Sequence, residues 1–282
     1  MKEVNVRKRR RSAAGILTGG KKPPANAYQN CEMGDTLCNN GLISEALTYY
    51  RKAVDMEKRN AGFRTRLGDA YAYSEMSVKA VEEYKKAIKL SPRRAEPHYS
   101  LAEVYRRFGQ WDAAIPEYRL AVKHNAMNPF YRYRLGSALW QIGEFDEAVL
   151  QLEVAVQLAD SDAFYHFWLS DILSKRGRII DAISEMQQAT IFASSDSYYS
   201  FRLGLLYIMG GFFEESVEAF KRAIMLNPED RSYHRVLAEA MRLCGNDYEA
   251  GLHETIAGNM DSFDYASLAA MKKGAGVTTS WD

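Results

Sequence analysis

A spacing pattern that repeats every 34 residues constrains the fold of this 282-residue chain more than any other feature of its sequence. In residues 61–94 the pattern is marked by Leu67, Gly68, Tyr71, Ala80, Tyr84, Ala87 and Pro92. Leu67 and Tyr71 lie one helical turn apart and form an apolar stripe, whereas the glycine and the alanines stand where helices must approach closely. Pro92 cannot continue a helix, so it ends the second helix of the unit. The pattern predicts a helix–turn–helix hairpin that must stack on similar hairpins to bury its apolar face.

The period runs without insertion or deletion through seven units, which are 27–60, 61–94, 95–128, 129–162, 163–196, 197–230 and 231–264. With this register and these residues, the chain resembles the tetratricopeptide-repeat (TPR) proteins. The resemblance implies an all-α fold, in which antiparallel helix hairpins stack into a right-handed superhelix, an α-solenoid. It also implies a concave groove lined by the first helix of each unit, and a role as an adaptor that binds peptides or protein surfaces.

Four positions depart from the repeat pattern. Glu75 replaces the turn glycine of unit two, Ser170 replaces a glycine or alanine in unit five, and Ser216 replaces the alanine of unit six. Glu254 stands where unit seven should carry a large apolar residue. Because terminal repeats carry a polar outer face, we expect unit seven to cap the stack.

The two ends of the chain fall outside the repeats. Residues 1–26 hold eight Lys or Arg and one Glu, a net charge of +7; of the 37 basic and 36 acidic residues in all, 29 and 35 remain, so the rest of the chain carries −6. We expect residues 1–26 to be a disordered basic arm and residues 265–282 to be a C-terminal tail. The arm has three interpretations: it contacts nucleic acid or an anionic membrane, it folds back on the acidic repeats, or it only aids solubility.

The first helices of units four to six carry the candidate binding residues. By helical phase, positions two, five, nine, twelve and thirteen of each first helix face the groove, and position six lies on its flank. In these units such positions are largely aromatic or apolar, and an exposed patch of that kind usually marks a partner site. The expected partner-binding residues are Phe130, Tyr133, Trp140, Phe164, Phe167, Trp168, Tyr198, Phe201, Leu205, Ile208 and Met209, with Arg134 and Arg202 beside them. The competing interpretation is that an aromatic at position five only packs on the neighbouring unit.

Charged residues of both signs surround this patch, which would suit a peptide with apolar anchors and a few charges; they are Arg106, Arg107, Arg134, Asp171, Lys175, Arg202 and Arg242. Some TPR relatives clamp a C-terminal carboxylate. Here Asp35 and Glu96 stand among the matching positions, so we expect no such clamp.

The sequence offers no candidate for catalysis, for a metal ion or for a cofactor. His98, His166 and His234 all occupy position four of their units and are 68 residues apart, so two stacked units separate each pair. Ligands of one metal ion must lie within a few ångströms of it, which makes these histidines part of the repeat register. No serine or cysteine motif with a nearby base appears either. We therefore expect a protein that is not an enzyme.

Composition limits the remaining function classes. The net charge of +1 argues against a dedicated nucleic-acid binder. Cys31 and Cys38 are seven residues apart on one predicted helix, too far for a disulfide, and unpaired cysteines fit a reducing compartment. No signal peptide is evident, and the longest apolar run, residues 203–213, is too short to span a bilayer, so a cytoplasmic location is expected.

Three hypotheses of function follow. The leading one is an adaptor that binds a protein or peptide partner in the groove of units four to six. The second is a scaffold that self-assembles through the groove or by end stacking. The third is a tether to nucleic acid or an anionic membrane through the basic arm.

Overall fold

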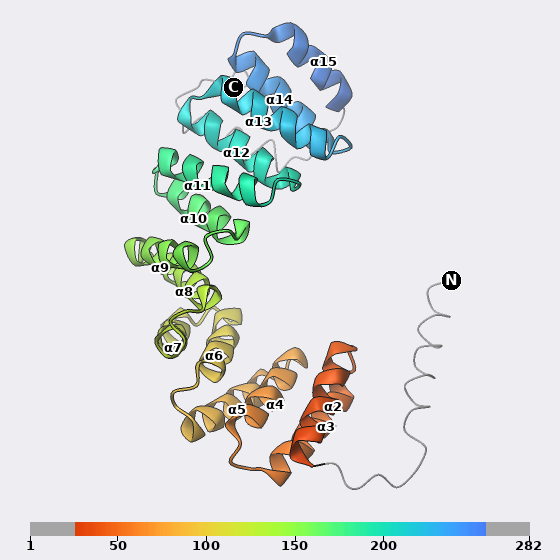
Figure 1. Ribbon diagram of the computed structural model, residues 1–282, viewed down its shortest axis with the longest axis vertical. Helices are drawn as coiled ribbons and strands as arrows, with labels where there is room; N and C mark the ends of the chain where they lie inside the picture. The colour runs from red at the N-terminus through yellow and green to blue at the C-terminus, as the bar shows by residue number, and fades with distance from the viewer. Residues whose placement is uncertain (1–25, 258–282) are drawn as a thin grey trace, which may run out of the picture. The chain divides into compact units, whose positions relative to one another are not determined.

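The computed structural model describes residues 26–257, and the predicted arm 1–26 (apart from Asn26) and the predicted tail 265–282 lie outside them. The described chain is a succession of α-helices without strands (Figure 1). The helices are α2 (Ala27–Asn39), α3 (Ile43–Met56), α4 (Ala61–Tyr73), α5 (Ser77–Leu90), α6 (Ala95–Arg107), α7 (Trp111–His124), α8 (Pro129–Gln141), α9 (Phe145–Leu158), α10 (Ala163–Lys175), α11 (Ile179–Phe192), α12 (Ser197–Gly210), α13 (Phe213–Leu226), α14 (Arg231–Leu243) and α15 (Asp247–Ala257). No helix in this part of the chain has the length and apolarity that crossing a bilayer requires.

The first helix of each unit starts at the first residue of that unit, and in six of the seven units the residue just before it explains why. A side-chain oxygen at this N-cap accepts hydrogen bonds from the free backbone N–H groups of the first turn, which favours a helix start there. The N-cap residues that do so are Asn26, Asn60, Asn128, Asp162, Asp196 and Asp230.

The turn inside each hairpin needs a residue in the left-handed conformation, which favours glycine. Glycine supplies it, with φ between 65° and 84°, at positions 41, 109, 143, 177, 211 and 245. In unit two the same position is Glu75, which adopts φ 60° despite having a side chain. The missing turn glycine therefore leaves the turn in place but under backbone strain.

Small residues let the two helices of a hairpin approach closely. A Cβ added to Gly68 would lie 2.6 Å from the ring of Tyr84, so the aromatic ring occupies the space that a larger residue would need. In unit five the facing residue is Met186, which has no ring, and Ser170 fits. Its hydroxyl donates a hydrogen bond to the carbonyl of Ala182 at 2.6 Å.

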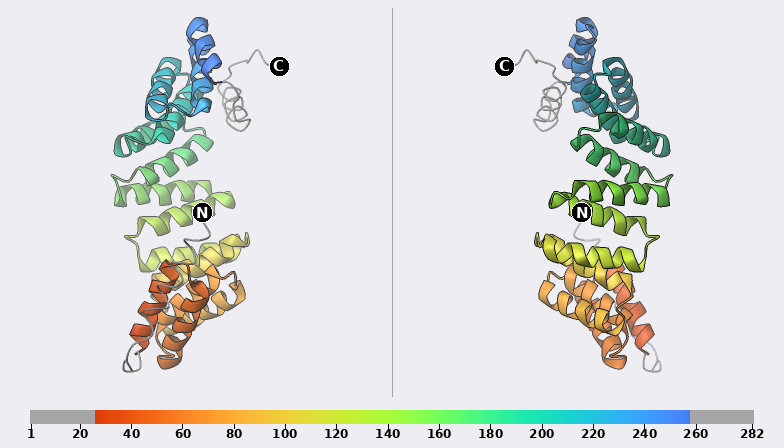
Figure 2. Two further views of the ribbon diagram at one scale, coloured as in Figure 1. Left: turned by 90° about the vertical axis from the view of Figure 1, so that its right-hand side faces the viewer. Right: turned by 90° about the vertical axis from the view of Figure 1, so that its left-hand side faces the viewer.

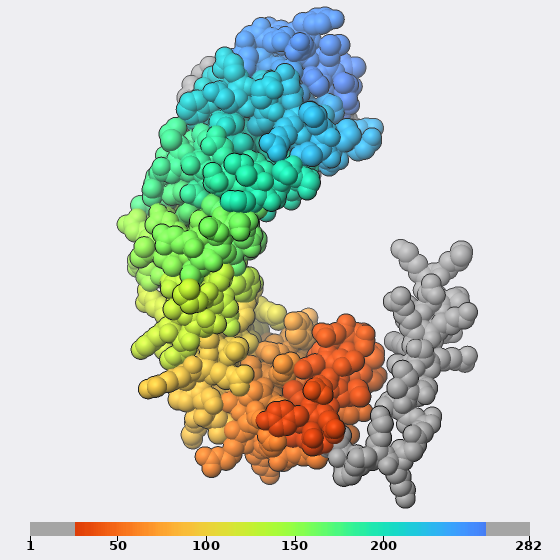
Figure 3. Space-filling model, in the orientation of Figure 1, coloured from red at the N-terminus to blue at the C-terminus, as the bar shows by residue number. Residues whose placement is uncertain are grey.

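The chain divides into two compact parts, each larger than one repeat unit; the first part ends at Arg107 and the second part begins at Phe108. The described residues of the first part form α2–α6, whose core is one cluster around Tyr50, Leu67 and Tyr84. The described residues of the second part form α7–α15. Within it the hairpins stack in chain order, with their side chains in contact (Figures 2 and 3). The all-helical architecture of stacked hairpins predicted from the 34-residue period is confirmed.

The second part of the chain, α7–α15, has two core clusters. One extends from α8 to α13 around Leu152, Leu169 and Met186. The other extends from α12 to α15 around Phe220 and Leu237. The aromatic side chains expected to bind a partner lie on or in these clusters, so their exposure decides which of them are accessible.

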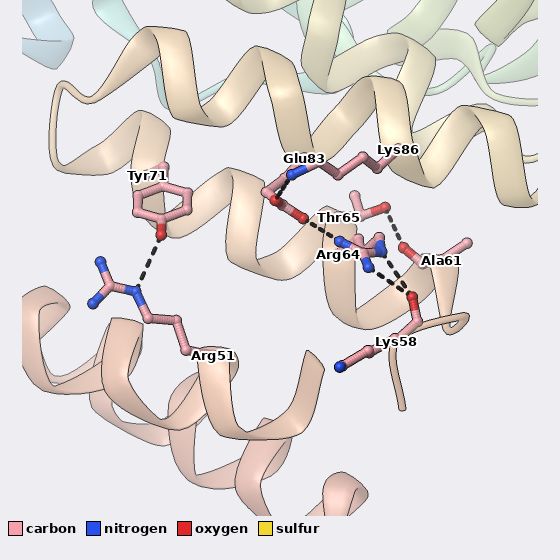
Figure 4. Close-up of polar contacts among 8 residues, drawn as sticks. All are labelled: Arg51, Lys58, Ala61, Arg64, Thr65, Tyr71, Glu83 and Lys86. Atoms are coloured by element: carbon pink, nitrogen blue, oxygen red, sulfur yellow. Dashed lines mark hydrogen bonds and ion pairs between the residues drawn. The ribbon is translucent and has the colours of Figure 1, made fainter. Parts of the chain in front are cut away.

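Position four of the first helix carries a polar clamp, which we call the position-four clamp. In unit two the Arg64 guanidinium donates through Nε and Nη2 to the carbonyl of Lys58, at 2.9 and 2.8 Å, and through Nη1 to Glu83 at 2.7 Å (Figure 4). Lys86 also donates to Glu83, at 2.6 Å. The clamp joins the loop before the hairpin to both of its helices.

The same clamp explains the histidines at position four. The ring of His166 lies 2.8 Å from the carbonyl of Asp160 and 2.7 Å from Glu185, and Arg132 bonds the carbonyl six residues earlier and Gln151 in the same way. Burial lowers the pKa of His166, but its hydrogen bonds to Glu185 and the Asp160 carbonyl and the nearby carboxylate charge outweigh this effect, so the net pKa is raised. The histidine thus makes the same two contacts, to the carbonyl six residues earlier and to the second helix, that arginine makes at position four of other units.

Buried tyrosines of the second helices are paired with acids of the first helices. Tyr50 donates to Asp35 and Tyr84 donates to Asp69, each at 2.7 Å. Burial raises the pKa of Asp69, although the hydrogen bond from Tyr84 opposes this shift. A buried hydroxyl needs an acceptor, which explains why acids stand at position nine in these units.

Candidate functional site

Six aromatic side chains of α8, α10 and α12 form a continuous series of ring contacts, which we call the aromatic ladder. Its members are Phe130, Tyr133, Phe164, Trp168, Phe167 and Tyr198. Successive ring centroids in this order lie between 4.9 and 6.2 Å apart, which is the spacing of favourable aromatic pairs. Thus six of the seven rings predicted from positions two, five and six of units four to six come together, and Phe201 does not join them.

Exposure differs along the ladder. Tyr198 is 43% exposed, and Phe130, Phe164, Phe167 and Trp168 are partly buried against the core with one side accessible. Tyr133 is buried and supports the rings on either side of it. Trp140 and Met209 are also partly buried against the same core.

Four of the expected binding residues are not accessible, namely Tyr133 and three residues of α12. Ile208 is 0% exposed, and Phe201 and Leu205 are buried with it in the cluster that α12 shares with α13 and α14. The ring of Phe201 stacks on Tyr233 of α14, with centroids 4.9 Å apart and planes at 23°. The expectation that these three, and Tyr133, face an open groove was wrong. At Tyr133 and Phe201 the competing interpretation, packing on the neighbouring unit, describes the structure.

Arg134 lies against the ladder at its α8 end. Its guanidinium carbon is 5.2 Å from the ring centroid of Phe130 and 5.7 Å from that of Tyr133. A guanidinium over aromatic faces is attracted by the ring quadrupole, so these contacts hold both rings in place.

Arg202 has the same place at the α12 end. Its guanidinium lies 5.3 Å from the ring centroid of Phe167, donates to the hydroxyl of Tyr198 at 3.0 Å and donates to Asp171 at 2.9 Å. The two arginines predicted beside the patch therefore fasten ladder rings, and Arg202 also neutralises a nearly buried carboxylate.

A small pocket of about 60 Å³ opens beside the ladder, between α8 and α10. We call it the tryptophan pocket; it is lined by Tyr133, Ser137, Trp140, Gln141, Leu152, Trp168, Asp171, Ile172 and Lys175. Ser137 and Gln141 were not among the predicted site residues. They occupy positions nine and thirteen of α8, which face the groove by helical phase. The prediction missed them because it was limited at those positions to apolar residues.

Other candidate sites are weaker. A hollow of about 470 Å³ lies over the loop Glu57–Asn60, but only these four loop residues line it. Within residues 26–257, no three histidine, cysteine or acidic side chains gather closely enough to hold a metal ion. His98 instead lies 3.1 Å from the carbonyl of Pro92, and His234 pairs with His253 across α14 and α15 at 3.0 Å.

Comparison with known structures shows the fold. The chain is similar to YrrB, a TPR protein with an unusual peptide-binding site, with a TM-score of 0.55, 22% identity and coverage of 64% of this chain and 93% of that one. It is also similar to pilF of Pseudomonas aeruginosa (TM-score 0.61, 18% identity, 76% and 97% covered) and to MamA of Desulfovibrio magneticus RS-1 (0.52, 22%, 58% and 92%). No curated protein matches the chain in sequence.

Family models give the sequence counterpart of this likeness. Two models described as tetratricopeptide repeat match residues 99–164, 133–198 and 198–230, and one described as TPR repeat matches residues 79–109. Together they extend over residues 79–230, more than half of the chain. The seven-unit period, the stacked hairpins and these matches agree, and the chain belongs to the tetratricopeptide-repeat family.

Proposed function

We propose that this chain is a non-enzymatic adaptor that binds a partner protein or peptide along the aromatic ladder. The observation that carries the proposal is that the ring contacts run without interruption across the first helices of three successive hairpins, and that five of the six rings are accessible. Proteins of this family are generally non-catalytic scaffolds. Contiguous exposed aromatics are typical of partner sites, and aromatic residues are enriched among those that contribute most to binding.

The ladder also has the rigidity that a binding surface benefits from. Arg134 and Arg202 hold rings at its two ends, and buried Tyr133 supports its middle. Association costs free energy for every mobile side chain that it orders, so rings already fixed in the free protein lose little on binding. Because four of the predicted residues are buried, the accessible set is narrower than the sequence predicted. It consists of Phe130, Phe164, Phe167, Trp168 and Tyr198, with Trp140 and Met209 beside them.

The test compares a ladder variant with a matched surface variant. Phe164→Ala combined with Tyr198→Ala removes two accessible rings, whereas Tyr248→Ala removes a ring on α15 that is 80% exposed and outside the ladder. Both proteins should keep the far-UV circular dichroism and the melting temperature of a folded chain. Each is used for affinity capture from the native cell with quantitative mass spectrometry.

We expect the intact chain and Tyr248→Ala to retain a common set of proteins that the ladder variant loses. Equal retention by all three folded proteins would overturn the assignment of the site. Sedimentation of the same three proteins addresses self-assembly: an oligomer of the intact chain that only the ladder variant loses would assign the ladder to contacts between copies. The tether hypothesis concerns residues 1–26, which lie outside the described residues except Asn26.

A further inference from the structure

The walls of the tryptophan pocket have the chemistry of a cation site. Three of its side chains, Tyr133, Trp140 and Trp168, are aromatic, and Asp171 is the one acidic group in its lining. The Asp171 side chain is only 11% exposed, so its charge is poorly screened by water. Aromatic faces arranged beside a carboxylate attract ammonium groups and repel anions.

The chain itself places an ammonium group at this position. Nζ of Lys175 lies 2.7 Å from Oδ2 of Asp171 and 6.0 Å from the ring centroid of Trp140. The pocket wall therefore already binds a primary amine, supplied by the last residue of α10.

Lys175 is held less firmly than the other cation on Asp171. Its side chain is 52% exposed and has one ion pair, whereas the side chain of Arg202 is 20% exposed and bonds both Asp171 and Tyr198. An exposed lysine pair of this kind contributes little stability, because water and salt screen it and its flexible stem loses entropy. Lys175 can thus leave without breaking the Arg202 contacts.

Exchange of one ammonium group for another leaves no buried charge unpaired. Oδ1 of Asp171 keeps Arg202 while Oδ2 accepts the incoming amine, and the displaced ammonium group of Lys175, whose side chain is already 52% exposed, moves into water. The incoming side chain would gain apolar contact with the two indoles, because the methylenes of a lysine stem pack on aromatic faces. An acidic group would instead have to approach the Asp171 carboxylate.

We propose that the tryptophan pocket binds a lysine side chain of the partner, whose ammonium group replaces Lys175 on Asp171 and whose stem lies against Trp140 and Trp168. The inference rests on the proposed function for the source of that lysine, but its chemistry is testable without the partner. It requires the partner to have a lysine at the position that contacts this pocket.

The probe is Nα-acetyl-lysine amide, added to the full chain labelled with ¹⁵N. Nα-acetyl-norleucine amide, which has the stem without the charge, and Nα-acetyl-glutamate amide serve as controls. The chain has four tryptophans, so the indole N–H signals of Trp140 and Trp168 report on the pocket, and those of Trp111 and Trp281 report on nonspecific effects. We expect saturable shifts of the first two signals with the lysine probe only.

The decisive variant is Lys175→Ala, because a pocket that prefers cations should bind its ligand more tightly without Lys175, whereas a pocket that prefers anions should bind its ligand more weakly. If Lys175 competes with the ligand, its removal lowers the dissociation constant of the lysine probe by about 2- to 6-fold. This is the factor by which an internal ion pair of about 0.2–1 kcal/mol reduces the fraction of protein whose pocket is vacant. Lys221→Ala, which removes a lysine paired with Glu218 on α13, should leave the dissociation constant of the lysine probe unchanged. Trp140→Leu should weaken binding, and it avoids the risk that Asp171→Asn unfolds the chain.

Weaker binding of the lysine probe to Lys175→Ala, or binding of the glutamate probe in its place, would overturn the proposal. Absence of saturable shifts with all three probes would overturn it as well. Failure of the proposed function is a separate result. In that case the lysine probe still binds, but the ladder variant keeps every captured protein.

Discussion

The turn of unit two offers a direct test of how backbone conformation limits the stability of this fold. Glu75 has φ 60°, whereas the six corresponding residues at positive φ are glycines. A residue other than glycine at positive φ lowers the free energy of unfolding by about 1–2 kcal/mol. Glycine avoids this strain, but its greater conformational freedom in the unfolded chain lowers the free energy of unfolding by about 0.4–1 kcal/mol. The Glu75 side chain is exposed, so its removal costs little packing. Glu75→Gly should therefore stabilise the α4–α5 hairpin by about 1 kcal/mol.

The matched control is the reverse change at Gly177, whose φ is 76° and whose added Cβ would meet no atom within 4 Å. Gly177→Ala should destabilise the α10–α11 hairpin by about 1 kcal/mol through backbone strain alone. Native-state hydrogen exchange is the suitable assay, because repeat arrays need not unfold in one step. A change of 1 kcal/mol alters the exchange rate of the hairpin amides about fivefold. The reasoning fails if Glu75→Ala, which keeps positive φ, stabilises the hairpin as much as Glu75→Gly does.

Three further predictions concern groups away from the ladder. Tyr84→Phe should destabilise the α4–α5 hairpin by about 1–2 kcal/mol in urea unfolding, because partly buried Asp69 loses its hydroxyl donor, and the loss should shrink in an Asp69→Ala background. Gly68→Ala should cost about 1–3 kcal/mol by the same assay, because the new Cβ would lie 2.6 Å from the Tyr84 ring. Acidification should loosen the α14–α15 hairpin: burial and the neighbouring His234 lower the pKa of His253, so the stability from this group is present above the ordinary histidine pKa and is lost as pH falls through the folded value. The hydrogen-exchange protection factors of α15, which are corrected for the slower intrinsic exchange of amides in acid, should therefore fall as pH drops below about 6.5, and His253→Asn should remove that dependence.

The fold was predictable because its period is local. A residue that caps a helix, turns the chain or fits under an aromatic ring does so through neighbours at fixed distances along the sequence. Ser170 departs from a rule that was stated for one residue at a time, but its hydroxyl is satisfied by the carbonyl of Ala182 across the hairpin, and the position of the ring of Tyr84 is taken by Met186.

The accessible part of the site was less predictable, because exposure depends on the next hairpin. Phe167 and Phe201 both occupy position five, yet Phe167 is partly exposed beside Tyr198, whereas Phe201 is buried under the ring of Tyr233. Helical phase gives the direction of a side chain and not the ring that will cover it. The tryptophan pocket was hidden for a related reason, since the spacing from Asp171 to Lys175 indicates an ion pair but not the indole beside it.

The position-four clamp has a consequence for where this chain tolerates inserted residues. Arg64 and His166 each reach back to a carbonyl six residues earlier, so an added residue in the loops that join one hairpin to the next would move that acceptor out of range. Position four also makes contacts across the turns inside the hairpins, from Arg64 to Glu83 and from His166 to Glu185, but these join residues of the two helices, so an insertion in the turn itself leaves both partners in place. Tags, epitopes or fused domains are therefore better placed at a turn such as Gly177 than in the segment before α4 or α10.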